Sequence, residues 1–201
     1  MIRWIQKKIR TQISARLSRE TLLSQAVHGD NGTAIAAIEE LKERLHFQDG
    51  SLQGHSFAGA RLHKVQLAKA RLQLADFTGA TLTTCYFGDA DLSKAKLVKA
   101  NLADGNLREC NLTDADLTGA SLRGAHLAKA DLRGANLRSA DLTGANLWQV
   151  SLHAANLTGA DLNEANLSGA VFNSHTVMPD GQNWHDALDL SVYTGRSQFS
   201  R

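Results

Sequence analysis

Leucine or phenylalanine recurs at every fifth position from Leu52 to Phe172, in one register and without an insertion. The residue two before each of these 25 centres is small or modest in size: 18 Ala, 2 Gly, 2 Cys, 2 Val and one polar exception, His55. Every five residues therefore contribute two apolar positions. Phenylalanine replaces leucine at only four centres, Phe57, Phe77, Phe87 and Phe172.

Neither regular secondary structure has a period of five. On an α-helix each successive centre rotates by about 140°, which scatters the leucines around the whole circumference. In a flat strand an odd step sends successive centres to opposite faces. The centres share one interior only if the chain turns a corner about once every repeat. The pattern therefore predicts an all-β solenoid.

The remaining positions of the repeat favour such corners. Asn or Asp stands directly before 13 of the 25 centres, and Gly stands two after the centre nine times. Asx side chains bond nearby backbone groups, and Gly tolerates a positive φ. The small residue two before the centre is expected to face inward beside a corner, where a longer side chain would meet the next layer.

The motif A-(D/N)-L-x-x, as in Ala115-Asp116-Leu117 and Ala165-Asn166-Leu167, resembles the pentapeptide repeat family. The resemblance covers Gly50 to about Ser174. It implies a right-handed quadrilateral β-helix with four repeats per coil, hence about six coils. At roughly 4.8 Å per layer this rod would be about 30 Å long. We assign residues 50–174 to the β-helix.

Residues 1–49 lack the repeat and form an N-terminal helical segment. The helical spacing of its apolar residues predicts a helix from about Ile2 to His28, which can break near Ser18. The turn at residues 29–32 ends it, and Thr33 is the expected N-cap of a second helix that runs to about His46. This second helix is expected to cover the first coil, because a solenoid end needs a cap.

Residues 175–201 form the expected C-terminal cap or tail. A turn at residues 178–181 follows the last repeat. A homodimer contact through a terminal segment is the competing use of this tail. Five apolar residues can cover the last coil: Trp184, Leu188, Leu190, Val192 and Tyr193.

Charge is concentrated at the beginning of the chain. The first nineteen residues carry six Lys and Arg and no acid, although the whole chain has a net charge of only +2. A basic amphipathic helix with a Trp can lie on an anionic membrane or dock on an acidic protein. A solvated face on a packed helix is the plainer interpretation. The candidate contact residues are Arg3, Trp4, Lys7, Lys8 and Arg10.

The sequence contains no pattern that indicates catalysis, a cofactor or a metal. The eight histidines are dispersed without zinc-ligand spacing, and no phosphate loop or nucleophile elbow is present. Cys85 and Cys110 both occupy the small inward position, where a reduced thiol acts as a slightly larger Ala. We expect a non-enzymatic cytoplasmic protein, with the inner membrane face as a peripheral location if the basic helix binds lipid.

Function is therefore expected on the outer surface of the rod. Because the basic residues are dispersed and aromatic residues are few, direct binding of nucleic acid is disfavoured. The first hypothesis is a scaffold or protein-binding module, and the exposed residue best suited to a contact is Trp148.

The resemblance also implies an alternative, a DNA mimic that binds DNA gyrase. Such mimicry needs a strongly negative surface, whereas residues 50–174 carry 12 basic and 11 acidic side chains. An acidic strip through Asp89, Asp104, Glu109 and Asp114 stays open, although three lysines, Lys94, Lys96 and Lys99, interrupt it.

Overall fold

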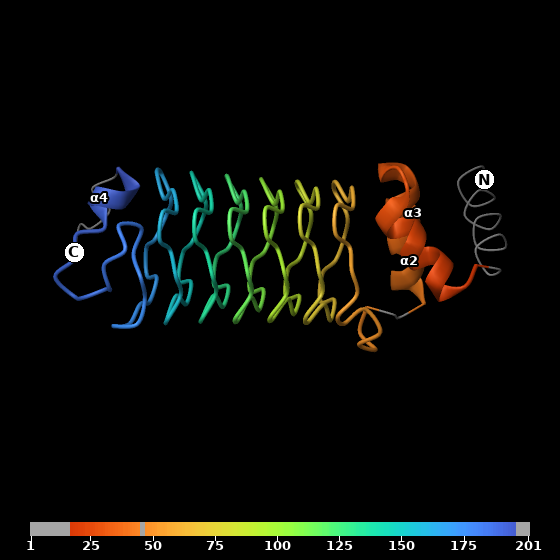
Figure 1. The fold of residues 1–201 in the computed structure, drawn as a ribbon, viewed down its shortest axis with the longest axis horizontal. Helices are drawn as coiled ribbons and strands as arrows, with labels where there is room; N and C mark the ends of the chain where they lie inside the picture. The colour runs from red at the N-terminus through yellow and green to blue at the C-terminus, as the bar shows by residue number, and fades with distance from the viewer. Residues whose placement is uncertain (1–16, 45–46, 196–201) are drawn as a thin grey trace.

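The repeats form a rod with a helical segment at one end and an irregular segment at the other (Figure 1). The computed structural model describes residues 17–44 and 47–195. Helices α2 (Arg19–His28) and α3 (Asn31–Glu43) precede the coils, and the short helix α4 (Ser191–Thr194) follows them.

Each coil closes after 20 residues. An unbroken series of parallel bridges joins residue i to residue i+20, from Ser56–Asp76 to Ser151–Val171, and the bridging residue always stands one before a centre. Four repeats therefore make one coil with four sides. Side 1 carries the repeats centred on Phe57 and every twentieth residue after it. Sides 2, 3 and 4 follow in chain order, from Leu62, Leu67 and Leu72, and side 4 also includes the repeat of Leu52.

The five backbone N–H groups of a repeat have fixed partners. Two donate to the next coil, one donates to the previous coil, and one closes the turn onto the preceding centre. The fifth donor, one after the centre, points away from the ladder and takes a side-chain acceptor. In the repeat of Leu112 the bonds run from Cys110 to Leu107, Asn111 to Ala90, Leu112 to Asp131, Thr113 to the Asn111 side chain, and Asp114 to Arg133.

This fifth donor explains the Asn and Asp before the centres. All thirteen accept a hydrogen bond through Oδ1 from the N–H two residues later, at 2.9–3.3 Å. The contact is an Asx turn, which satisfies a donor that the parallel ladder cannot use. The turn-forming role expected of these residues is therefore confirmed.

The position two after the centre has a left-handed backbone in every repeat from residue 54 to residue 169. Its φ lies between 54° and 69° at all 24 positions, yet only nine of them are Gly. The other fifteen hold a conformation that costs an L-residue about 1 kcal/mol or more. Ladder bonds on both sides of the corner keep them there.

The interior is built from the centres and the small positions. Among the described residues all centres except Phe172 are buried. Phe57 stacks on Phe77 with ring centroids 5.0 Å apart, and Phe77 meets Phe87 edge-on at 6.2 Å. The rod is therefore a filled core without a lumen.

The helical segment closes the N-terminal end. Leu22 and Ala26 of α2 and Ile38 and Leu41 of α3 are buried in the same core as the leucine centres. The guanidinium of Arg19 donates to the Ser51 carbonyl. Further bonds join this segment to the coils through Asn31 and His63, and through Phe47 and Arg71.

The helix boundaries refine the sequence expectation. Ser18 is the N-cap of α2, where the break was expected, and its side chain accepts from the Thr21 N–H. The expectation that Thr33 caps the next helix is wrong. Asp30 is the N-cap, because its carboxylate accepts at 2.8 Å from the N–H of Thr33, which already lies inside α3.

The last coil continues for part of a turn into the C-terminal segment. Val177 bridges Asn156, a spacing of 21 rather than 20 residues, so the register slips by one here. Trp184 stacks on Phe172 with centroids 4.4 Å apart, and Leu190 is buried. Val192 was expected in this cover, but it is 77% exposed because it lies on the outer face of α4.

Candidate interaction surfaces

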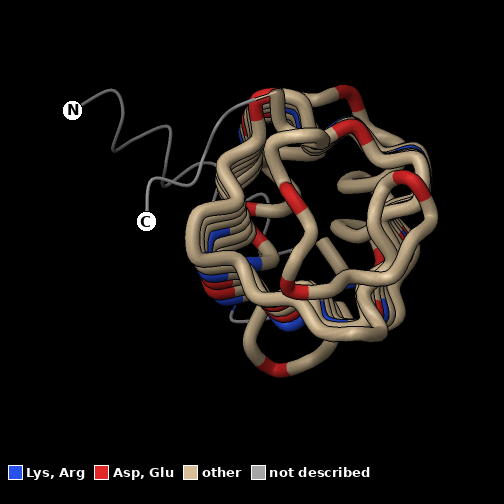
Figure 2. Tube along the Cα trace, turned by 90° about the vertical axis from the view of Figure 1, so that its left-hand side faces the viewer, with Lys and Arg blue, Asp and Glu red and all other residues tan. Residues whose placement is uncertain are grey.

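The four sides of the rod carry almost no net charge. Within residues 50–174 the Lys, Arg, Asp and Glu side chains sum to +1, −1, +1 and 0 on sides 1 to 4. The colours of Figure 2 show both signs around the outline of the rod. A surface that imitates a duplex would need one continuously negative side. The structure offers none among the described residues.

The candidate acidic strip is divided among three sides. Asp89 and Glu109 lie one coil apart on side 3, whereas Asp104 belongs to side 2 and Asp114 to side 4. On side 3 this acidic pair stands between Lys69 and Lys129 in the same column. The strip expected as an alternative is therefore limited to two neighbouring carboxylates.

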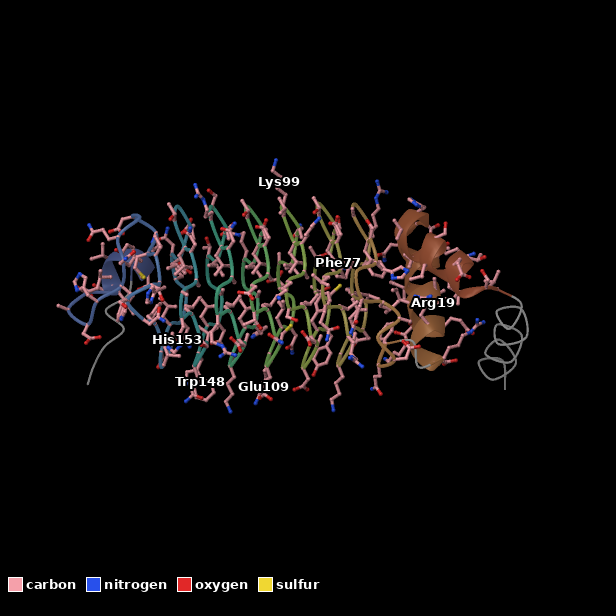
Figure 3. All side chains as sticks on the ribbon, turned by 60° about the horizontal axis from the view of Figure 1, so that its bottom comes forward. Arg19, Phe77, Lys99, Glu109, Trp148 and His153 are labelled. Carbon is pink, nitrogen blue, oxygen red and sulfur yellow. The ribbon has the colours of Figure 1, made fainter. Side chains whose placement is uncertain are left out.

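Trp148 lies on side 3, with 37% of its surface exposed. Figure 3 shows it projecting from the same part of the rod as Glu109, while Lys99 of side 1 projects the opposite way. The ammonium of Lys129 lies 5.5 Å from the centroid of the indole ring, a cation–π contact. Sequence reasoning named Trp148 but missed Lys129, because the two become neighbours only through the 20-residue coil.

An area without charged side chains extends from Trp148 towards the C-terminal end, whereas Lys129 contacts the indole ring from the preceding coil. From residue 139 to residue 174, no Lys, Arg, Asp or Glu lies on side 3 or side 4. Val171, on side 4, is 47% exposed. We call this area the Trp148 surface. Its outward residues are Asn146, Trp148, Gln149, Ser151, His153, Ala154, Asn166, Ser168, Gly169, Val171, Asn173 and Ser174.

Tyr86 is the second exposed aromatic of side 3. It is 39% exposed and lies three coils from Trp148, towards the N-terminal end. Its ring packs over Gly88, where a Cβ atom would lie 2.9 Å from the ring. Tyr86 is flanked along its side by Lys69 and Asp89, and no charge-free area like the one next to Trp148 adjoins it.

The thiols of Cys85 and Cys110 are buried and pack in the hydrophobic core. Cys85 donates to the Leu62 carbonyl and Cys110 to the Ala90 carbonyl. Burial raises the pKa of the Cys85 thiol to about 12, and burial also raises the pKa of Cys110. Within residues 17–44 and 47–195, no group of three His, Cys, Asp or Glu side chains is arranged to hold a metal ion.

The candidate contact residues Arg3, Trp4, Lys7, Lys8 and Arg10 lie outside the described residues. In the described ranges, no helix combines the length and the apolar character that a membrane span requires.

Comparison with known proteins agrees with the repeat architecture. The family model for pentapeptide repeats matches residues 44–79, 75–114, 110–149 and 151–174, with eight copies. The chain belongs to the pentapeptide repeat family. Pentapeptide repeat proteins are generally structural or binding proteins rather than enzymes. No curated protein sequence matches the chain.

Solved pentapeptide repeat structures resemble parts of the chain. A protein from the Arabidopsis thaliana thylakoid lumen is 36% identical over 45% of this chain and 63% of its own length, with a TM-score of 0.44. Rfr23 from the cyanobacterium Cyanothece is 30% identical over 69% of this chain and 99% of its own, with a TM-score of 0.36. The fluoroquinolone resistance protein QnrB1 is 21% identical over 63% and 64%, with a TM-score of 0.38.

Proposed function

We propose that this protein is a rigid, non-catalytic scaffold that binds a protein partner through the Trp148 surface. The single observation that carries the proposal is the exposed Trp148 at the edge of an area without charged side chains. The cores of protein interfaces are depleted of charge and enriched in Trp, and Trp is a frequent binding hot spot.

Rigidity supports the scaffold role. Every coil is joined to its neighbours by ladder bonds on all four sides, and the centres form one continuous core. Such a rod presents its outward side chains at fixed spacings, with the small entropy cost on binding that preorganisation gives.

Affinity capture from the native host tests this proposal, with the wild type compared with Trp148→Ala. The matched control is Tyr86→Ala, because Tyr86 is an aromatic of similar exposure on the same side. We expect Trp148→Ala to reduce recovery of the partner at least tenfold, about 1.4 kcal/mol, as for a hot-spot residue. Equal recovery with both variants would remove the proposal.

The alternative, a DNA mimic directed at gyrase or another topoisomerase, has little support in the charges. No side of the rod departs from neutrality by more than one unit within residues 50–174. A gyrase supercoiling assay tests it, and we expect no inhibition at micromolar protein. Inhibition at such concentrations would favour this alternative over the scaffold.

Residues 1–19 provide an electrostatic attachment point in this proposal. Trp4 and five of the six basic side chains suit an acidic protein surface or an anionic membrane, whereas the sixth, Arg19, donates to the Ser51 carbonyl. Flotation with anionic liposomes, with and without residues 1–16, tests the membrane version. Equal recovery of both forms would eliminate it. A cytoplasmic location stays a prediction.

A further inference from the structure

Lys129 and Trp148 are held together by the backbone of the rod. The N–H of Lys129 donates at 2.8 Å to the carbonyl of Trp148, in one of the ladder bonds between neighbouring coils. The Lys129 ammonium lies 5.5 Å from the centroid of the indole ring, and the Trp148 N–H donates at 3.2 Å to the Asn146 side chain. The aromatic ring and the positive charge are therefore presented together, at a spacing that the coils set.

The charge of Lys129 is not compensated by a neighbouring acid. The two acids nearest to it in the coil register are Glu109, one coil earlier in the same column, and Asp131, across the next corner. Glu109 pairs with Arg108 at 3.1 Å, and Asp131 pairs with Arg133 at 2.6 Å. In the part of the chain that the structure describes, Lys129 forms no ion pair with a carboxylate. A cation without a carboxylate therefore stands at the edge of the uncharged area.

A partner that covers the Trp148 ring also covers part of Lys129. The ammonium is a strongly hydrated charge, and removing water from an unpaired charge costs free energy that only a counter-charge with good hydrogen-bond geometry offsets. Because the ammonium and the ring centroid are 5.5 Å apart, a partner cannot bury the indole without dehydrating the Lys129 ammonium in part. A matching partner therefore brings a carboxylate to Lys129 together with an apolar group for the ring.

The rest of the Trp148 surface suits the main chain of a peptide. The Nδ2 group of Asn166 donates at 3.2 Å to Oδ1 of Asn146, whereas Nδ2 of Asn146 has no acceptor among the described residues. This amide can donate to a peptide carbonyl. Val171 is 47% exposed and offers a second apolar contact. The surface carries no Asp or Glu that would repel an incoming carboxylate.

We propose that the Trp148 surface recognises a protein segment in which an Asp or Glu side chain stands next to an apolar side chain. The carboxylate pairs with Lys129, and the apolar side chain packs on the exposed indole. The inference rests on the proposed scaffold function and names the chemistry of its partner. Basic and uncharged segments bind less well, because they leave Lys129 without a counter-charge in the interface.

Selection from a random peptide library displayed on phage tests the inference. The full chain is immobilised, and the peptides that it retains are sequenced. We expect the wild type to enrich peptides with Asp or Glu next to an apolar residue, and we expect Trp148→Ala to lose them. Because displayed peptides are joined to the coat protein through their C-terminus, an enriched carboxylate belongs to a side chain.

A matched pair of lysine variants measures the contribution of Lys129. Lys129→Gln should weaken binding of an amidated synthetic copy of an enriched peptide about tenfold, as fluorescence anisotropy would show. Lys69→Gln is the control and should bind like the wild type. Lys69 lies in the same column of side 3, is exposed, and has a φ of 58° compared with 60° at Lys129.

Charge reversal separates pairing from a structural effect of Lys129 on the ring. Lys129→Glu should bind the acidic peptide poorly, and it should bind a peptide with Lys in place of the acid better than the wild type does. A role of Lys129 in orienting the indole alone would not reverse this preference. The substitution spares the fold, because the side chain is exposed and the ladder bond comes from the backbone N–H.

The possible failures are distinguishable. Trp148-dependent peptides without an enriched acid, or equal affinities of the wild type and Lys129→Gln, would overturn the inference and leave the scaffold function standing. Equal weakening by Lys69→Gln would show a general attraction between charges and would overturn it too. Peptides that bind the wild type and Trp148→Ala alike, or a library without any enrichment, would count against the Trp148 surface as a protein-binding site and remove the inference with it.

Discussion

The Oδ1 atom of Asn31, in helix α3, accepts a 2.8 Å hydrogen bond from the backbone N–H of His63, in the first described coil. His63 stands one after a centre, where the N–H normally donates to an Asn or Asp two residues earlier. That earlier residue is Arg61, which has no acceptor. The helical cap therefore supplies from a distance of 32 residues the acceptor that the local repeat lacks.

Replacing Asn31 should destabilise the junction between α3 and the first coil. Asn31→Ala leaves the partly buried His63 N–H without its acceptor, at an expected cost of about 1 kcal/mol. Arg61→Asn alone should be nearly neutral because Arg61 is exposed. It should rescue Asn31→Ala by providing a local Asx turn. Urea unfolding of the four proteins in this double-mutant cycle gives the coupling. If the changes in unfolding free energy of the two single variants simply add in the double variant, the Asn introduced at position 61 does not replace Asn31 as the acceptor for the His63 N–H.

The left-handed corners predict which substitutions by glycine stabilise the rod. Thr84 is β-branched and has a φ of 55°, so Thr84→Gly should raise the free energy of unfolding by about 1 kcal/mol. Asp104→Gly should gain less, since Asp tolerates this conformation better. Urea unfolding ranks the two variants.

The reverse change at a corner provides a control. Gly144→Ala should destabilise by about 1 kcal/mol through the backbone alone, because a Cβ there would meet no atom within 4 Å. A neutral Gly144→Ala together with a neutral Thr84→Gly would show that the corners are not strained.

The two cysteines should be unreactive while the rod is folded. Burial raises the pKa of Cys85 to about 12 and that of Cys110 as well, so almost no thiolate exists at pH 8. Iodoacetamide should label neither residue in the native protein and both in urea, as mass spectrometry would show. Rapid native labelling of either thiol would place it outside the core.

Acid should weaken the corner at Asp76. Hydrogen bonds from the Thr78 hydroxyl and N–H lower the pKa of Asp76 in the folded protein. A lowered folded pKa gives stability that is present above the unfolded pKa of about 3.9 and is lost as pH falls through the folded pKa. In Asp76→Asn the side-chain oxygen still accepts the hydrogen bond from the Thr78 N–H, but the side chain no longer titrates. The unfolding free energy of the wild type should therefore fall more steeply than that of Asp76→Asn below about pH 4. Parallel curves would show that Asp76 does not contribute to acid unfolding.

The repeat itself was predictable because the residue type at each of its positions follows from the local backbone geometry and burial of that position. The central leucine, the small alanine two residues before it and the Asn or Asp that forms the Asx turn all lie within one repeat of five residues. Asp116 and Asp76, in different coils, both accept a hydrogen bond through Oδ1 from the N–H two residues later. The role of Asn31 was not predictable from the sequence. Its side chain accepts from the His63 N–H because Arg61, in the coil, has no acceptor for that donor, whereas Asn31 itself lies in α3.

The surfaces were predictable only in part. Trp148 was predicted from the sequence as a contact residue. Its neighbour Lys129 was not, because only the 20-residue coil brings the two side chains together.

Because each coil closes after four repeats, the number of repeats between two points sets both their rotation about the rod axis and their separation along it. Adding a single block of five residues would turn everything beyond it by a quarter of a revolution relative to α2 and α3. Adding four such blocks would restore the original orientation and move the far end outward by one layer, about 4.8 Å. The direction in which Trp148 points and its height above the N-terminal helices can thus be set independently by the number of blocks between them.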